Sequence, residues 1–201
     1  MEPIYEACSR LGLTIFLHPH YGLGEGANQS LLSGYGHVLP LALGFPFETT
    51  IAVSRLLLSG ALDRHPALTC LLAHAGGAIP FLAGRLDSCL ASDPEVAARI
   101  KLTPSEYLRR NFVYDGVIYH RPGLEALLEF LGPEHRGKVV FGTDHPFFPP
   151  KGEGATVGAS LWPSATKNVR IAWDVERDDR GLWEGIMWRN ASRLLRIPMD
   201  D

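Results

Sequence analysis

The sequence is poor in cysteine. Its 201 residues include three, Cys8, Cys70 and Cys89, which are scattered along the chain and form no CxxC pair. So sparse and odd a set argues against a disulfide framework and against a thiolate metal site. We therefore expect a protein of a reducing compartment, and cytoplasmic localisation is the prediction.

Strong charge of one sign is also missing. The net charge is -3 and the pI is near 6.2, so nothing indicates a nucleic-acid partner. No uninterrupted apolar run reaches the roughly 18 residues that a membrane span needs, and residues 1–12 lack the pattern of a signal peptide. With 46% hydrophobic residues and a mean hydropathy of +0.02, the composition is that of an ordinary globular protein.

Apolar strands alternate with helices along the chain. This order is typical of βαβ units and a parallel sheet, and so of an α/β fold with about four such units. A long loop rich in glycine and serine follows the first strand, near 21–40, and a loop of proline and glycine follows the last, near 147–158. The strands are predicted at 14–20, 68–77, 111–119 and 138–148, and the main helices at 3–12, 48–62, 79–92, 105–111 and 122–134, followed by two tryptophan-bearing helices.

Three of these strands end on side chains that can bind a metal or move a proton. They are His18 before a proline, His74 before Ala-Gly-Gly, and Asp144 before His-Pro. The carboxyl ends of parallel strands lie at one edge of the sheet, where α/β proteins carry their chemistry. Two imidazoles and a carboxylate form a donor set that zinc or a similar divalent ion takes in catalytic sites.

Plainer interpretations of the same residues stay open. Each of the three side chains could cap a turn or form a hydrogen bond in the core. His18 and His20 could instead form a metal pair, because alternate residues of a strand share one face. Pro19 bends the chain between them, which favours a place for His20 in a substrate pocket. Arg85, taken alone, is a solvated charge on a helix face.

Five motifs carry a resemblance to a known family. HPHYG, FPFETTIAVSRLLLSG, LLAHAGGAIPFLAGRLD, FGTDHPFF and RNASRLL resemble the decarboxylase branch of the amidohydrolase superfamily. That branch includes aminocarboxymuconate semialdehyde decarboxylase and the salicylate- and resorcylate-type decarboxylases. The resemblance extends from about residue 10 to 197. HPHYG and GHVLPLALGFPFETT are most similar to the fungal 6-methylsalicylate decarboxylases.

The resemblance implies a fold and a place for this chain within it. The family forms a metal-dependent (β/α)8 TIM barrel with one divalent ion at its C-terminal mouth. This chain would be a single partial barrel domain over residues 1–201, with the C-terminal four βα units. The family's His-x-His on its first strand has no counterpart here, and the N-terminal strands are expected to be absent from this chain.

The resemblance also implies roles for individual residues. His18 and Asp144 would bind the metal, with zinc expected and manganese as the alternative. His74 and Asp144 would be catalytic. Arg85, His20 and Phe147 would bind substrate, Arg85 in the site of a neighbouring subunit, which implies a homodimer.

The function that follows is metal-dependent, non-oxidative decarboxylation of a small aromatic acid such as 6-methylsalicylate. The predicted partner is that small-molecule carboxylic acid, with no nucleic acid and no membrane. Alternatives are an aminocarboxymuconate semialdehyde decarboxylase, a metal-dependent hydrolase of the same superfamily, and a catalytically inactive half-barrel remnant. No glycine-rich phosphate motif opens a helix after a strand, so no nucleotide cofactor is predicted.

Overall fold

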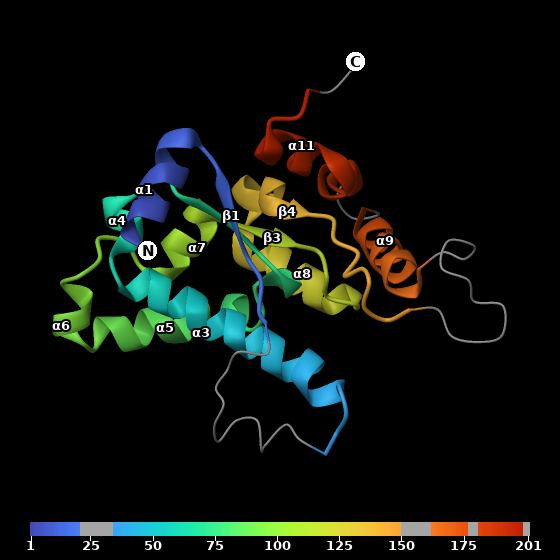
Figure 1. Ribbon diagram of the computed structural model, residues 1–201, viewed down its shortest axis with the longest axis horizontal. Helices are drawn as coiled ribbons and strands as arrows, with labels where there is room; N and C mark the ends of the chain where they lie inside the picture. Colours follow the sequence, from blue (N-terminus) through green and yellow to red (C-terminus); the bar gives the residue numbers. More distant parts are fainter. Residues whose placement is uncertain (21–33, 150–161, 177–180, 199–201) are drawn as a thin grey trace. The chain divides into compact units, whose positions relative to one another are not determined.

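The computed structural model of the chain describes residues 1–20, 34–149, 162–176 and 181–198 (Figure 1). Most of the two predicted long loops lies outside these described residues. The chain groups into two compact units, Met1–Val113 and Tyr114–Asp201, which are described separately below. The single domain predicted over 1–201 stays a prediction.

The first unit begins with a helix that glycine ends. α1 stops at Leu11, where Gly12 takes the left-handed conformation (φ 64°) that suits a helix C-cap. The strands of this unit, β1 and β2, pair in parallel from Thr14↔Thr69 to Leu17↔Leu72. The elements are α1 (Glu2–Leu11), β1 (Thr14–Leu17), π-helix η1 (Pro40–Gly44), α3 (Phe45–Leu58), α4 (Ala61–Arg64), β2 (Thr69–Leu72), 3-10 turn η2 (His74–Gly76), α5 (Ile79–Ala91), α6 (Pro94–Ala97) and α7 (Pro104–Asn111).

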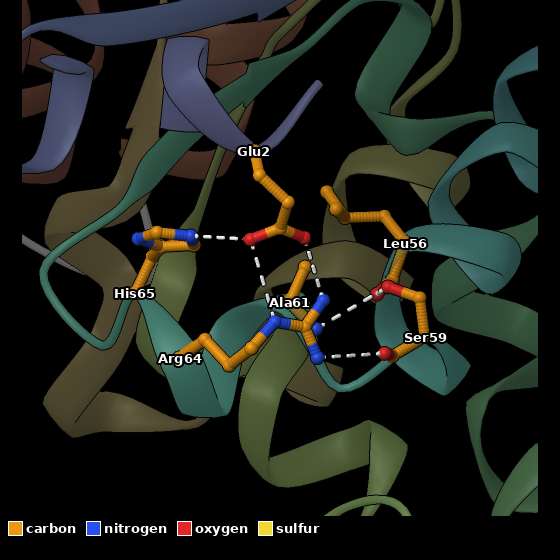
Figure 2. A network of polar contacts seen from close by, with 6 residues as sticks. All are labelled: Glu2, Leu56, Ser59, Ala61, Arg64 and His65. Atoms are coloured by element: carbon orange, nitrogen blue, oxygen red, sulfur yellow. Dashed lines mark hydrogen bonds and ion pairs between the residues drawn. The ribbon is translucent and has the colours of Figure 1, made fainter. Parts of the chain in front are cut away.

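An exposed polar cluster ties α1 to α4 (Figure 2). The Glu2 carboxylate accepts hydrogen bonds from Arg64 Nη2 at 2.7 Å and from His65 Nε2 at 2.8 Å. Arg64 also donates through Nη1 to the carbonyl of Ser59 at 3.1 Å, so it joins the helix end to the cluster. The hydrogen bonds from Arg64 and His65 lower the pKa of Glu2 from 4.5 to about 2.

The second unit contains a parallel strand pair with helices around it. β3 (Phe112–Asp115), which begins at the boundary, pairs with β4 (Val139–Val140) through Tyr114↔Val139 and Asp115↔Val140. α8 (Arg121–Leu131) buries four leucines at helical spacing, namely Leu124, Leu127, Leu128 and Leu131. The remaining elements are 3-10 helix η3 (Pro133–Lys138), α9 (Pro163–Glu176), α10 (Leu182–Glu184), π-helix η4 (Gly185–Arg189) and α11 (Asn190–Leu195).

The α/β fold with four parallel-paired strands is confirmed, but the strands are shorter than predicted. The predicted strands 68–77 and 111–119 stop at Leu72 and Asp115. Residues with positive φ follow, from His74 to Gly77 after the first strand and at Tyr119 after the second. The predicted helix 48–62 begins at Phe45 and is interrupted at Gly60 (φ 70°). A Cβ at Gly60 would lie 2.6 Å from the Arg99 carbonyl oxygen, so this turn needs glycine.

The expectation that no segment is long and apolar enough to cross a membrane needs correction. Within the described residues, Pro40–Leu58 forms one 19-residue helix with a mean hydropathy of 1.4. Glu48 and Arg55 interrupt the apolar run of this stretch in the sequence, so no uninterrupted run marks it. Length and composition alone are weak support for a span, since core helices of soluble proteins pass the same test, and 33% of this stretch is buried.

Candidate metal and active site

His18 directly follows β1 and presents one ring nitrogen for binding. Its Nδ1 lies 2.7 Å from the Pro19 carbonyl oxygen. A carbonyl can only accept, so in this contact Nδ1 carries the proton and donates. The lone pair of neutral His18 is then on Nε2. A fixed Nδ1–H donor of this kind orients metal-binding histidines in proteins.

His74 lies beside His18. β2 ends at Leu72 rather than at His74, but the Ala73 N–H donates to the Leu17 carbonyl at 3.2 Å and extends the parallel ladder by one residue. The two strand ends are therefore adjacent, and the centroids of the His18 and His74 rings are 5.3 Å apart. The structure thus confirms that these two strand ends bring two imidazoles together.

Phe45 forms an apolar wall at this pair. Its ring centroid lies 6.2 Å from that of His18 and 6.1 Å from that of His74, and the residue is 5% exposed. Phe45 was not predicted from the sequence. It begins the FPFETT motif, but no periodicity marks it as a neighbour of the histidines.

The turn that carries His74 has an unusual backbone. His74 and Ala75 both have φ of 54°, a region that costs non-glycine residues roughly 1–2 kcal/mol each. Such conformations persist only where the surroundings fix them, and they cluster at functional sites.

The start of α3 fixes this turn. Thr50 Oγ1 donates to the Pro46 carbonyl at 2.7 Å and accepts from the Ala78 N–H at 2.9 Å. Gly77 has φ of 65°, and a Cβ there would lie 2.2 Å from the Pro46 oxygen. Glycine at position 77 thus lets the turn approach α3, and the approach sets the position of His74 next to β1.

The predicted substrate residues of this unit lie at its surface. His20 is exposed, and its backbone N–H donates to Glu48 Oε1 of α3 at 3.1 Å. This contact adds a carboxylate that the sequence analysis missed. Arg85 is exposed on α5, as is Phe81 one turn before it. The substrate-binding roles of His20 and Arg85 stay predictions.

Asp144 of the second unit follows β4 and receives a hydrogen bond from a residue that the sequence analysis did not name. The Tyr119 hydroxyl donates to Asp144 Oδ2 at 2.5 Å. Both residues have positive φ, 61° and 57°, in the loops after β3 and β4. Burial, and then the hydrogen bond to Asp144, raise the pKa of Tyr119, so its hydroxyl remains a donor at neutral pH.

Asn168 of α9 joins the two loops that carry this pair. Its Oδ1 accepts from the Tyr119 N–H at 3.3 Å, and its Nδ2 donates to the Gly142 carbonyl at 3.2 Å. Asn168 is 2% exposed. Because buried amides that make both kinds of hydrogen bond hold their neighbours in place, Asn168 fixes the loops on which Tyr119 and Asp144 lie.

Phe147 is held within the loop after Asp144. Its N–H donates to the Asp144 carbonyl at 2.8 Å, and its own carbonyl accepts from Trp162 Nε1 at 2.7 Å. Phe147 is half-buried. The structure thus fixes its backbone beside Asp144, and its role in substrate binding stays a prediction.

The imidazole and carboxylate side chains of the candidate site are of the types that bind divalent metals, but they make up only part of a metal site. His18 offers Nε2, His74 is its neighbour, and Asp144 belongs to the second unit. Across the ranges that the structure describes, no three His, Cys, Asp or Glu side chains lie close enough together to hold a metal ion. Catalytic zinc sites use three protein ligands, so a complete site would need donors beyond the two adjacent histidines.

A family comparison identifies the wider relationship. The profile described as Amidohydrolase matches residues 2–197. The chain belongs to the amidohydrolase family. Its curated relatives include the 2-amino-3-carboxymuconate-6-semialdehyde decarboxylase of Dictyostelium discoideum, 32% identical over 152 residues that cover 75% of this chain and 39% of that protein. The 6-methylsalicylic acid decarboxylase of Penicillium expansum is 34% identical over 152 residues, 74% of this chain and 43% of that protein.

Solved structures of decarboxylases are similar to this chain in fold. The apo form of Metarhizium anisopliae IDCase superposes with a TM-score of 0.82 at 41% identity, over 97% of this chain and 51% of that one. A dihydroxybenzoic acid decarboxylase from Polaromonas, with bound manganese and an inhibitor, shares the fold at a TM-score of 0.73 and 21% identity, over 99% of this chain and 54% of that one. The chain spans about half the length of these relatives or less, which agrees with the predicted four βα units of a barrel. The decarboxylases among these relatives confirm the predicted resemblance to the decarboxylase branch.

Proposed function

We propose that the chain provides the metal-binding and proton-transferring half of a non-oxidative decarboxylase active site. The observation that carries this is the His18–His74 pair at the ends of two parallel strands, with Nε2 of His18 presented. Support comes from relatives named as decarboxylases of small carboxylic acids. We further propose a small aromatic acid such as 6-methylsalicylate as substrate, a cytoplasmic location, and a homodimer in which Arg85 holds the substrate carboxylate.

His18 and Asp144 would hold a divalent ion, zinc or manganese, which supplies Lewis-acid polarisation of the substrate oxygens when bound. His74 would deliver a proton to the ring carbon that bears the carboxylate. The bond to the carboxylate carbon then breaks, its electron pair returns to the ring, and carbon dioxide leaves. Histidine suits this role because its ordinary pKa lies near neutral pH. Phe45 would exclude water from the proton-transfer path.

The test is release of carbon dioxide from 6-methylsalicylate by the 201-residue chain, with zinc or manganese added. The His74→Ala variant should lose turnover by about a hundredfold or more, since general acid–base groups contribute that much. His135→Ala, which replaces a histidine of η3 in the second unit, serves as the control and should keep wild-type turnover. Equal turnover in wild type and His74→Ala would contradict the role of His74.

The same preparation separates the alternatives. Opening of a lactone without release of carbon dioxide would favour the hydrolase, because the same ligands can activate water. Turnover of the carboxymuconate semialdehyde in preference to 6-methylsalicylate would change the substrate only. A folded chain that binds metal but turns over neither acid nor lactone would indicate the inactive half barrel.

A further inference from the structure

A cavity in the second unit has an arginine-rich lining. Its volume is about 410 Å³, and its lining includes Arg136 of η3, Arg189 of η4 and Arg193 of α11. No Asp or Glu occurs among the described residues that line it. Three arginines from three separate elements thus line one hollow.

The carboxylate of Glu184 pairs with one arginine of this cavity. Arg189 Nη2 lies 2.6 Å from Glu184 Oε2, and the Arg189 guanidinium carbon lies 5.0 Å from the centroid of the Trp188 ring. These contacts hold Arg189 in place. The lining itself contains three arginines and, among its described residues, no carboxylate, and charges of one sign gathered in a hollow favour a bound ion of the opposite sign.

A buried amide forms the rigid part of the lining. Asn190 is 5% exposed, and its Nδ2 donates to the Val139 carbonyl of β4 at 2.8 Å. Gly137 and Gly185 flank it, since a Cβ on either would come within 3.7 Å and 3.4 Å of the Asn190 amide. Side chains at these two positions would fill the space beside Asn190. The small residues therefore keep the hollow open.

The cavity lies at the other end of β4 from Asp144. η3, which supplies Arg136 and Gly137, leads into the start of β4, whereas Asp144 follows the end of that strand. In β/α barrels the catalytic edge is the carboxyl one, and the opposite edge contributes to stability. An anion in this cavity would therefore act on the fold rather than react.

From this geometry we propose that the cavity is a binding site for a small oxyanion of the phosphate class. The planar guanidinium presents paired N–H donors that match phosphate oxygens, and hydrogen bonds between charged groups are the strong ones. A bound anion would link η3, η4 and α11. Because it binds the folded state, it would raise the stability of the chain.

The experiment is titration of the full 201-residue chain with inorganic phosphate, followed by calorimetry and by thermal unfolding, with sodium chloride adjusted to keep ionic strength constant. We expect saturable binding and a rise in the unfolding midpoint. Arg136→Gln and Arg193→Gln should each raise the Kd by about tenfold. Arg193 is exposed, so this variant leaves the test intact if Arg136→Gln fails to fold.

Two further variants sharpen the result. Arg99→Gln removes an exposed arginine paired with Glu95 outside the cavity and should leave the Kd unchanged. Glu184→Gln releases Arg189 from its carboxylate and should lower the Kd. Absence of saturable binding, an equal loss in Arg99→Gln, or weaker binding by Glu184→Gln would each overturn the proposal.

Discussion

The hydroxyl of Tyr119 donates a hydrogen bond to Asp144 Oδ2 at 2.5 Å, between the loops that follow two parallel-paired strands. Both loops reach this contact through residues with positive φ. One carboxylate oxygen of Asp144, the proposed metal ligand, is thus held by Tyr119, which orients the carboxylate. Partners that orient a ligand in this way are nearly as important to metal affinity as the ligand itself.

Replacing Tyr119 with phenylalanine should therefore weaken metal binding while leaving the fold in place. Loss of a side chain that orients a metal ligand typically costs about 10–100-fold in metal affinity, and loss of one hydrogen bond costs about 1–2 kcal/mol of stability. Equilibrium dialysis with manganese measures the first, and urea unfolding the second. Tyr35→Phe, at a 63% exposed tyrosine, is the matched control. Equal metal affinity in wild type and Tyr119→Phe would contradict the orienting role.

A pair of glycine substitutions tests the turn that carries His74. Gly77→Ala should destabilise the fold by about 3 kcal/mol or more, because φ is 65° and the new Cβ would meet the Pro46 oxygen at 2.2 Å. Gly84→Ala on α5 adds the same methyl group where no atom lies within 4 Å, and should stabilise the helix by about 0.5–1 kcal/mol. Urea unfolding of both variants measures the contrast. Similar effects in the two variants would rule out the close approach of the turn to α3.

The Glu2 cluster predicts a pH dependence of stability. The pKa of Glu2 is lowered from 4.5 to about 2 in the folded chain, so its contribution is fully present above pH 4.5 and is lost as the pH falls through about 2. Glu2→Gln should remove this part of the acid dependence and leave stability above pH 4.5 lower and flatter. Denaturant unfolding at several pH values from 2 to 6 measures it. Glu95→Gln is the control, since the Glu95 carboxylate on α6 pairs with Arg99 just beyond that helix. An acid profile unchanged by Glu2→Gln would show that α1 is not held by this cluster.

Much of the fold followed from the sequence because its signals are local. The four leucines of α8 repeat at helical spacing, and Gly12 marks the end of α1 as a C-cap. The predicted strand ends were less accurate, because the apolar residues continue past the point where the backbone turns. His74 and Asp144 lie in turns and have positive φ, and the sequences AHAGG and GTDHP do not predict this backbone conformation.

The candidate site was predicted only in part, for a similar reason. The approach of His18 to His74 follows from two parallel strand ends and was foreseen. Tyr119 and Asn168 were missed because their contacts join segments 25 and 49 residues apart, which no periodicity reveals. A tyrosine just past a strand of the same sheet, in a loop with Asp and Gly, was the signal that could have drawn attention to Tyr119.

The central proposal is that His18 and Asp144 help to hold a divalent metal, and a measurement of metal binding tests it most directly. Equilibrium dialysis of the 201-residue chain against zinc and, separately, manganese should give about one ion per chain. Binding should be lost in His18→Ala and in Asp144→Asn, and kept in His135→Ala. No bound ion, or the same affinity in His18→Ala as in wild type, would contradict the account.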